Sequence, residues 1–309
     1  MVKGMRIGVG VGANGIDDAI ARVKRAEEAG FHTAWFPNIF ACDALTLVAL
    51  AGRETARIEL GTAVVPTHSR HPLYMAQQAL TTQAATGGRL VLGLGPSHQV
   101  VVETLLGLSY EKPARHVREY VEVVRSLVET GRVAHRGRVY QVQGQVQVPG
   151  AKPFPILIAG LGERMRRLAG SLADGTVTWM TGKRTLRDVL VPAVRAAARE
   201  AGRPEPRIVA SLPVALCERP AEAREAISKA NAIYPSLPSY RAMLDLEGAG
   251  GAGDIALVGS EAEIERELEE LAAAGVTDLS AGVVGAGADP RAGARRTFEL
   301  LAGLARRAP

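Results

Sequence analysis

The chain has 309 residues, of which 47% are hydrophobic and 22% are charged. A sizeable core is therefore available, and the length fits two modest domains or one large α/β barrel. The net charge of +5 and the aromatic content of only 4% argue against nucleic-acid binding, which needs more rings for base stacking. They favour attraction of a small anionic ligand.

Strand-like and helix-like segments alternate along the chain, and most strands are followed by a helix whose apolar residues recur at helical spacing. The predicted strands cover residues 6–11, 33–37, 57–66, 89–95, 155–159, 175–180, 207–217 and 278–284. The predicted helices cover residues 16–30, 44–55, 72–86, 98–107, 113–130, 163–173, 186–201, a segment from Pro220, residues 260–274 and a segment from Pro290.

Three stretches depart from this alternation. Loosely alternating valines that end at a Pro-Gly pair predict an inserted hairpin at 131–150. Residues 233–253 are rich in proline and glycine, so we expect a mobile excursion there. Pro192 lies near the middle of the predicted helix 186–201, which is therefore either kinked or begins later.

Eight strands that are mostly parted by helices favour a parallel sheet, and eight is the number that closes a (β/α)8 TIM barrel. The predicted fold is therefore an α/β barrel with insertions at about 131–150 and 233–253. An open doubly wound sheet is the alternative. Because no linker or shift in composition divides the chain, we expect a single domain over 1–309.

The compartment is predicted from the cysteines and the apolar segments. Cys42 and Cys217 lie far apart without metal-ligand spacing, which favours free thiols in a reducing compartment. The glycines and aspartates of residues 8–18 do not fit a signal peptide, and no apolar run approaches the roughly 20 residues that span a bilayer. We expect a cytoplasmic enzyme with no membrane partner.

The C-terminal ends of the strands would form the active face of such a barrel. The segments found there show no metal-ligand cluster, no Gly-x-Ser-x-Gly elbow and no P-loop lysine. A site so poor in ionisable groups suggests that a bound cofactor carries the reaction. Residues 10–15 do match Gly-x-Gly-x-x-Gly, but a dinucleotide fold needs an acidic residue at the end of the next strand, where Asn38 stands.

Gly160-Leu161-Gly162 is a more useful glycine-rich turn. It joins a buried strand to a helix that carries several arginines, so its free backbone N–H groups and the helix dipole would hold a phosphate. A plain tight turn is the alternative. The position after a later strand favours the phosphate, because barrels often bind phosphate on their later loops.

The histidines and one lysine near the strand ends are candidates for binding and catalysis. His98 and Gln99 follow the fourth strand and either face the pocket or stay solvated. His68 points either into the pocket or outward, and Lys183 is either a counter-charge for an acidic ligand or a solvated lysine. His71 is expected to be structural. The other histidines are expected at the surface: His32, His116 and His135.

Several of these segments together resemble the bacterial luciferase-like family of flavin- and deazaflavin-dependent oxidoreductases. The resemblance rests on residues 60–72 for the third strand, 89–95 for the fourth, and 155–162 with 173–175 for a phosphate-binding segment. It also covers 28–35 and, more loosely, 275–284. No single motif is specific, but the ordered set is.

The resemblance implies a (β/α)8 barrel that holds an isoalloxazine or deazaflavin ring at its mouth. It implies that a non-proline cis peptide, here Ala63-Val64, supports the ring. Residues 93–99 look most like members that use coenzyme F420, whose acidic tail suits a basic chain. Taking the strand ends and the resemblance together, we expect cofactor contacts from Asn38, Ala63, Val64, Leu94, Gly95, Gln99, Ala159, Gly160, Leu161 and Gly162.

The family's sugar-phosphate dehydrogenases carry an Asp-His pair where this chain has Asn38-Ile39, and a glutamate where Pro96 stands. Sugar-phosphate oxidation is therefore not expected. The sequence predicts an F420-dependent oxidoreductase that moves a hydride to or from a small organic substrate. His98 is its candidate proton donor, and His68 and Lys183 are its candidate substrate contacts.

Two alternatives remain open at this stage. One is an FMN-dependent monooxygenase that uses reduced flavin and oxygen, and the other is a non-catalytic barrel that stores or senses a flavin. The resemblance also implies a homodimer.

Overall fold

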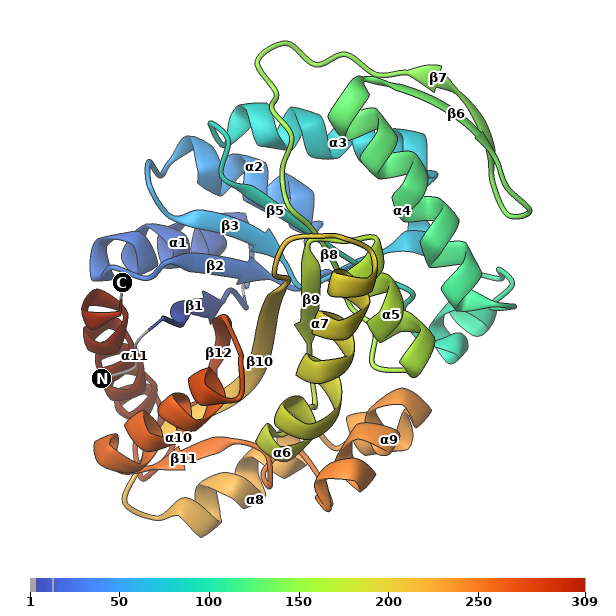
Figure 1. The fold of residues 1–309 in the computed structure, drawn as a ribbon. Helices are drawn as coiled ribbons and strands as arrows, with labels where there is room; N and C mark the ends of the chain where they lie inside the picture. Colours follow the sequence, from blue (N-terminus) through green and yellow to red (C-terminus); the bar gives the residue numbers. More distant parts are fainter. Residues whose placement is uncertain (1–3, 13, 309) are drawn as a thin grey trace.

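The computed structural model describes residues 4–12 and 14–308. Within this part of the chain, eight parallel strands pair in sequence order and form a closed ring (Figure 1). The ring closes where Arg6 of the first strand pairs with Asp278 of the last. The predicted (β/α)8 barrel is therefore confirmed, and the open sheet is wrong. The barrel strands are β1 (Arg6–Gly10), β2 (Thr33–Phe36), β3 (Glu59–Thr62), β5 (Leu90–Gly95), β8 (Ile156–Ile158), β9 (Gly175–Thr178), β10 (Arg207–Leu216) and β12 (Asp278–Val283).

Helices surround this ring and bury their apolar faces against it (Figure 1). Two short strands, β4 (Val65–Pro66) and β11 (Leu257–Gly259), extend the sheet beside β5 and β10. Among the described residues, no helix is long and apolar enough to cross a membrane. The surrounding helices are α1 (Ile16–Ala29), α2 (Ala44–Arg53), α3 (Pro72–Ala85), α4 (Pro113–Thr130), α5 (Glu163–Ser171), α7 (Val191–Glu200), α8 (Pro220–Ala230), α10 (Glu261–Ala273) and α11 (Pro290–Arg307).

Two predicted helices differ from the structure in their extent. The segment predicted at 98–107 forms only the π-helical turn η2 (Val101–Leu105). The segment at 186–201 begins later, because Pro192 occupies the first turn of α7, where a missing N–H costs no helical hydrogen bond. The short helix α6 (Lys183–Thr185) and the π turn η3 (Leu186–Leu190) precede it.

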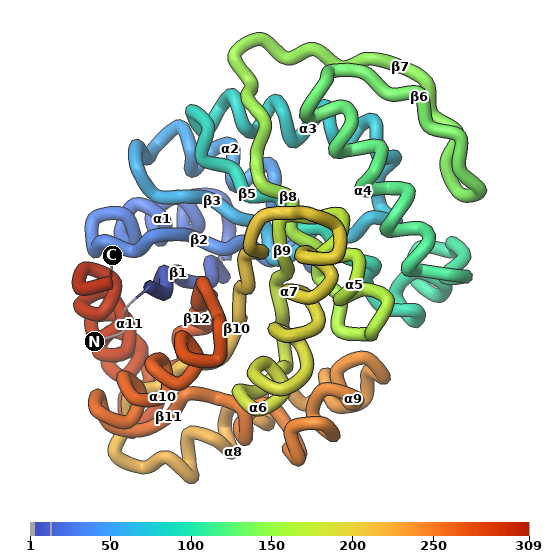
Figure 2. The backbone as a smooth tube through the Cα atoms, viewed as in Figure 1, coloured from blue at the N-terminus to red at the C-terminus, as the bar shows by residue number. Residues whose placement is uncertain are grey.

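The first insertion is the predicted hairpin, formed by antiparallel β6 (Arg132–Arg136) and β7 (Gln141–Gln145). Figure 2 shows it outside α4, away from the barrel strands. The buried carboxylate of Glu119 on α4 accepts hydrogen bonds from the backbone N–H groups of Val139 at 2.7 Å and Tyr140 at 3.0 Å. This carboxylate ties the hairpin to the barrel's outer layer.

The second insertion does not match the prediction of a mobile excursion. Residues 233–253 contain η4 (Tyr234–Ser236) and the helix α9 (Pro238–Glu247), which packs on α6. Pro238 opens the helix, and Gly248 ends it in the left-handed conformation with φ of 76°. The expected helix-breaking residues therefore define the ends of an ordered helix.

Charged side chains near the N-terminal ends of the strands close the barrel floor. Arg207 of β10 donates to Asp278 of β12 at 2.6 Å and to Glu59 of β3 at 2.6 Å. These carboxylates raise the pKa of Arg207, although its burial acts the other way. The guanidinium lies over the Trp35 ring inside the barrel, 5.6 Å from the ring centroid. A ligand must therefore approach from the opposite end of the strands.

Candidate active site

The barrel interior ends in three half-buried apolar residues, Ala63, Val64 and Ala159, which we call the apolar lip. The Ala63–Val64 peptide bond is cis and lies between β3 and β4, as the resemblance predicts. The lip therefore presents small apolar groups at the C-terminal ends of β3 and β8. It packs against an interior layer made of Trp35, Val91, Leu157, Val177 and Val209.

Glycines of β5 leave room for the Val64 side chain. A Cβ atom on Gly95 would lie 2.8 Å from Val64 Cγ2, and one on Gly93 would lie 3.0 Å from Val64 Cγ1. A Cβ on Gly93 would also lie 2.1 Å from the backbone oxygen of Thr62. The side chain of Leu94, between them, is fully buried in the main core. The sequence Gly-Leu-Gly therefore shapes the lip through its two glycines.

The predicted phosphate segment joins β8 to α5, and Gly162 is the residue that precedes the first turn of the helix. No side chain caps this N-terminus, so the first N–H groups of α5 are free to bind an anion. Arg166 Nη1 donates to the carbonyl oxygen of Leu161 at 2.6 Å and braces the turn, while its Nε is buried without a hydrogen-bond partner. A Cβ on Gly160 would lie 2.2 Å from Met165 Cβ, so the turn requires glycine there.

His98 is half-buried in the loop after β5. Its ring centroid lies 5.1 Å from that of Tyr240 on α9. Burial lowers the pKa of His98 below its usual value. The neighbouring Gln99 is exposed, and its amide nitrogen donates to Glu103 at 2.9 Å. The loop therefore carries one partly shielded imidazole, three residues after Gly95.

The luciferase-like monooxygenase family matches residues 3–285 of this sequence. The chain belongs to this family. It is therefore a luciferase-like oxidoreductase, as the ordered set of sequence segments predicts.

Named relatives of this luciferase-like chain include two enzymes. A 5,10-methylenetetrahydromethanopterin reductase of Archaeoglobus fulgidus is 35% identical over 161 residues, which cover 50% of this chain and 47% of the relative. An F420-dependent glucose-6-phosphate dehydrogenase of Kineococcus radiotolerans is 30% identical over 219 residues, which cover 65% of this chain and 64% of the relative.

One solved structure superposes along nearly the whole luciferase-like chain. It is an F420-dependent secondary alcohol dehydrogenase in complex with an F420-acetone adduct, with a TM-score of 0.80 and 20% identity. The superposition covers 98% of this chain and 99% of that one. At this identity the likeness shows the shared fold.

Two histidines, His68 and His116, stack on each other. The rings of His68 and His116 lie 3.9 Å apart and are nearly parallel, at 1°. His116 Nε2 lies 3.1 Å from Thr67 Oγ1, and the Thr67 hydroxyl donates to the carbonyl of Gly95 at 3.3 Å. The expectation that His116 lies at the surface is therefore wrong, and His32 and His135 are half-buried as well.

Two other predicted site residues are engaged in the scaffold. Asn38 Oδ1 accepts the N–H of Ala44 at 2.9 Å and so supports the start of α2. Lys183 Nζ lies 2.5 Å from a carboxylate oxygen of each of two α10 residues, Glu267 and Glu270. The roles of Asn38 toward a cofactor and of Lys183 and His68 toward a substrate stay predictions.

Sequence reasoning missed a row of aromatic side chains that continues from His98. Tyr240 contacts Tyr234 with ring centroids 5.3 Å apart, and Tyr234 contacts Trp179 at 5.7 Å. Trp179 directly follows β9, so its position at a strand end was the one signal available. Tyr234 and Tyr240 belong to the insertion that was expected to be mobile.

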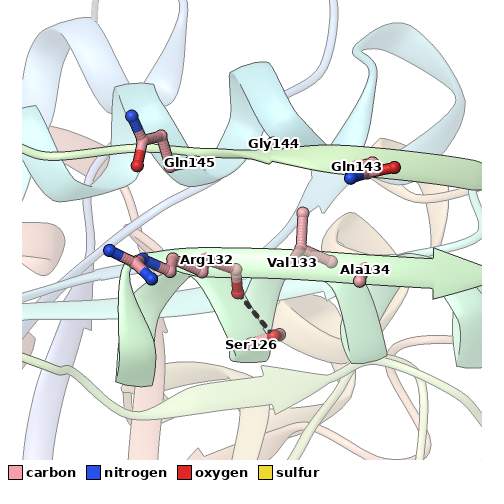
Figure 3. A pocket seen from close by; sticks show the side chains of 7 residues that line it. All are labelled: Ser126, Arg132, Val133, Ala134, Gln143, Gly144 and Gln145. Carbon is pink, nitrogen blue, oxygen red and sulfur yellow. Dashed lines mark hydrogen bonds between the residues drawn. The ribbon is translucent and has the colours of Figure 1, made fainter.

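A separate hollow of about 580 Å³ lies between α4 and the hairpin (Figure 3). Ser126 Oγ donates to the backbone oxygen of Arg132 at 2.7 Å across its edge. The hollow is formed where the hairpin packs beside α4, and it is separate from the barrel mouth. Its lining residues are Ser126, Arg132, Val133, Ala134, Gln143, Gly144 and Gln145. Among the residues that the structure describes, no group of three or more His, Cys, Asp or Glu side chains could hold a metal ion.

Proposed function

We propose that this chain is a coenzyme F420-dependent oxidoreductase that transfers a hydride between the deazaflavin and a small organic substrate. The observation that carries the proposal is the apolar lip with an uncapped helix N-terminus beside it. The lip offers small apolar groups to a tricyclic ring, and α5 offers N–H groups without a side-chain cap to a phosphate. The named relative that is 30% identical over 219 residues uses F420.

The described residues fit such a cofactor in three respects. The glycines of β5 leave room for the Val64 side chain in the lip, because a Cβ atom on Gly95 would lie 2.8 Å from Val64 Cγ2. The turn at Gly162 has open space around it, with no atom within 4 Å of a Cβ built there. Arg166, beside that turn, has a buried Nε that no other described residue engages in a hydrogen bond.

When bound, the reduced deazaflavin would supply the hydride, and the protein residues would position the reactants. The charged barrel floor and the filled interior keep water from reaching the lip from below. In its protonated form, which burial disfavours by lowering the pKa, His98 would donate a hydrogen bond and then a proton to the substrate atom that gains electrons as the hydride arrives. In the reverse direction its imidazole would accept that proton. Most of the rate would come from orientation of the reactants.

A matched pair of arginine variants tests the phosphate end of the site. Arg166 braces the glycine turn, whereas Arg167 is exposed and forms an ion pair with Glu200 at 3.6 Å. Both Arg166→Met and Arg167→Met remove one positive charge. We expect Arg166→Met to weaken F420 binding about tenfold and Arg167→Met to leave it nearly unchanged, as measured by quenching of F420 fluorescence. Equal effects of the two variants would contradict the proposed phosphate site.

The other readings predict different results. An FMN-dependent monooxygenase would bind FMN more tightly than F420 and consume oxygen with reduced flavin. A non-catalytic flavin-binding barrel would bind the cofactor and show no turnover that depends on His98. A homodimer, which the resemblance implies, is a separate proposal and is tested by sedimentation equilibrium of the purified chain.

A further inference from the structure

The row of aromatic residues beside His98 is not explained by cofactor binding. We call Trp179, Tyr234 and Tyr240 the aromatic wall. Successive ring centroids lie 5.7 and 5.3 Å apart at interplanar angles of 75° and 85°. Such edge-to-face contacts are favourable for aromatic side chains and leave ring faces and edges for a further partner.

The wall is held in place by its supporting helices. The Glu247 carboxylate at the end of α9 accepts the backbone N–H and the hydroxyl of Thr185, both at 2.7 Å, and the N–H of Arg184 at 3.1 Å. The Arg184 side chain in turn donates to the carbonyl of Leu246. Figure 1 shows α9 beside α6, which follows the end of β9. The insertion therefore brings its tyrosines to the mouth on a fixed support.

Charged groups next to the wall are already paired. Lys183 is engaged by Glu267 and Glu270, and these carboxylates raise its pKa against the effect of partial burial. Arg184 and Glu247 are engaged in hydrogen bonds that join α6 to α9. An ionised substrate would find no free counter-charge among these groups, and its charge would lose hydration on burial.

Two further features limit the chemical class of ligand that fits the wall. Within residues 4–12 and 14–308, the buried indole Nε1 of Trp179 has no hydrogen-bond partner, so the wall offers this donor to a ligand. Large apolar side chains are exposed on loops that follow two other strands. Phe40 is 72% exposed after β2, and Val100 is 54% exposed after β5.

We propose that the aromatic wall is the substrate-binding surface of this site, and that it selects an uncharged, flat compound with a carbonyl acceptor, such as an aryl ketone. This inference rests on the proposed function, in which a hydride passes between the cofactor and the carbonyl carbon of the substrate. In the direction of reduction, that carbon gains the hydride, the C=O π bond becomes an O–H bond, and His98 supplies the proton. The reduced deazaflavin is the reductant.

Three neutral or charged probes test the selection. Acetophenone is flat and uncharged, benzoate is flat and anionic, and cyclohexyl methyl ketone is uncharged and not flat. Equilibrium dialysis against the full chain, without cofactor and again with saturating F420, gives the dissociation constant of each. We expect acetophenone to bind about tenfold more tightly than either of the other two. Equal affinities, or tighter binding of benzoate, would overturn the inference.

Variants then locate the binding surface. Tyr234→Ala should weaken acetophenone binding about tenfold, and Tyr234→Phe should retain it because the ring remains. Trp179→Phe should weaken it by losing the donor while keeping a ring. The matched control is Tyr74→Ala, since Tyr74 is 64% exposed on α3 and lies outside the wall.

The two proposals fail in different ways. If F420 quenching is normal in every variant and acetophenone affinity does not change in Tyr234→Ala or Trp179→Phe, the aromatic wall is not the substrate surface. If F420 does not bind the unaltered chain at all, the proposed function fails, whatever the probes do. Circular dichroism of each variant separates lost binding from lost folding.

Discussion

The stacked pair His68–His116 predicts that the protein loses stability in mild acid. Burial and the neighbouring His68 lower the pKa of His116 from 6.5 to about 4, against a smaller opposing effect of Thr67 and Glu119. In the unfolded chain, His116 therefore binds a proton below a pH of about 6.5. In the folded chain, the same residue binds the proton only near pH 4. Stability from this group is complete above that range and falls as the pH drops through it. The expected loss is about 2 kcal/mol at about pH 5 and about 3 kcal/mol near pH 4.

Urea unfolding followed by circular dichroism, at about pH 7.5 and about pH 5, measures this loss. The variant His116→Phe cannot take up the proton, so its free energy of unfolding should change about 2 kcal/mol less between the two conditions. It also loses the contact with Thr67, which costs about 1 kcal/mol at both pH values and cancels in the comparison. His71→Asn is the control, because His71 is exposed and caps α3. An unchanged pH dependence in His116→Phe would refute the reasoning.

Three other predictions concern the scaffold of the site. Arg207→Met removes the nearest positive charge from the buried Asp278, which keeps Arg6 at 3.8 Å and the Thr277 hydroxyl at 2.7 Å. We expect a loss of about 3 kcal/mol in urea unfolding, and a loss under about 1 kcal/mol would contradict that role. Gly93→Ala forces a methyl group to 2.1 Å from the Thr62 backbone oxygen, so thermal unfolding should shift down by several degrees and F420 affinity should fall. Glu119→Gln weakens the acceptor of the hairpin's backbone N–H groups, so we expect faster proteolysis within 131–150. An unchanged cleavage rate would contradict this role of Glu119.

The barrel could be predicted because its strands are short buried runs with clear local limits. Each predicted strand overlaps one strand of the closed ring, and the hairpin follows from its alternating valines. The cis bond at Ala63–Val64 is different, since nothing in the local composition indicates it and only the resemblance to the family placed it. The short strands β4 and β11 were too brief to show a period of their own.

The prediction of a mobile excursion at 233–253 is wrong because proline and glycine do not break a helix at every position. Pro238 and Gly248 instead stand at the two ends of α9, where each residue is favoured. The helix is then fixed by Glu247, whose partner Thr185 lies 62 residues earlier in the chain. A contact over that separation leaves no local pattern, so the aromatic wall could not be predicted either.

His116 was misplaced for another reason. The surface prediction rests on the lack of a functional constellation around His116, yet His116 lies four residues before Tyr120 and next to Val117 on the buried face of α4. The helical spacing therefore indicates its buried position. Its partner His68 comes from a loop after β4, and that pairing is a tertiary contact.

The central claim is that the barrel mouth binds a deazaflavin ring on the apolar lip. The most direct measurement is a titration of F420 and of FMN against the purified chain, with Val64→Phe as the variant that fills the lip and Val139→Phe as the same change at an exposed position on the hairpin. We expect tighter binding of F420 than of FMN, about tenfold weaker F420 binding in Val64→Phe, and no change in Val139→Phe. Failure to bind F420, or equal binding by all three proteins, would contradict it.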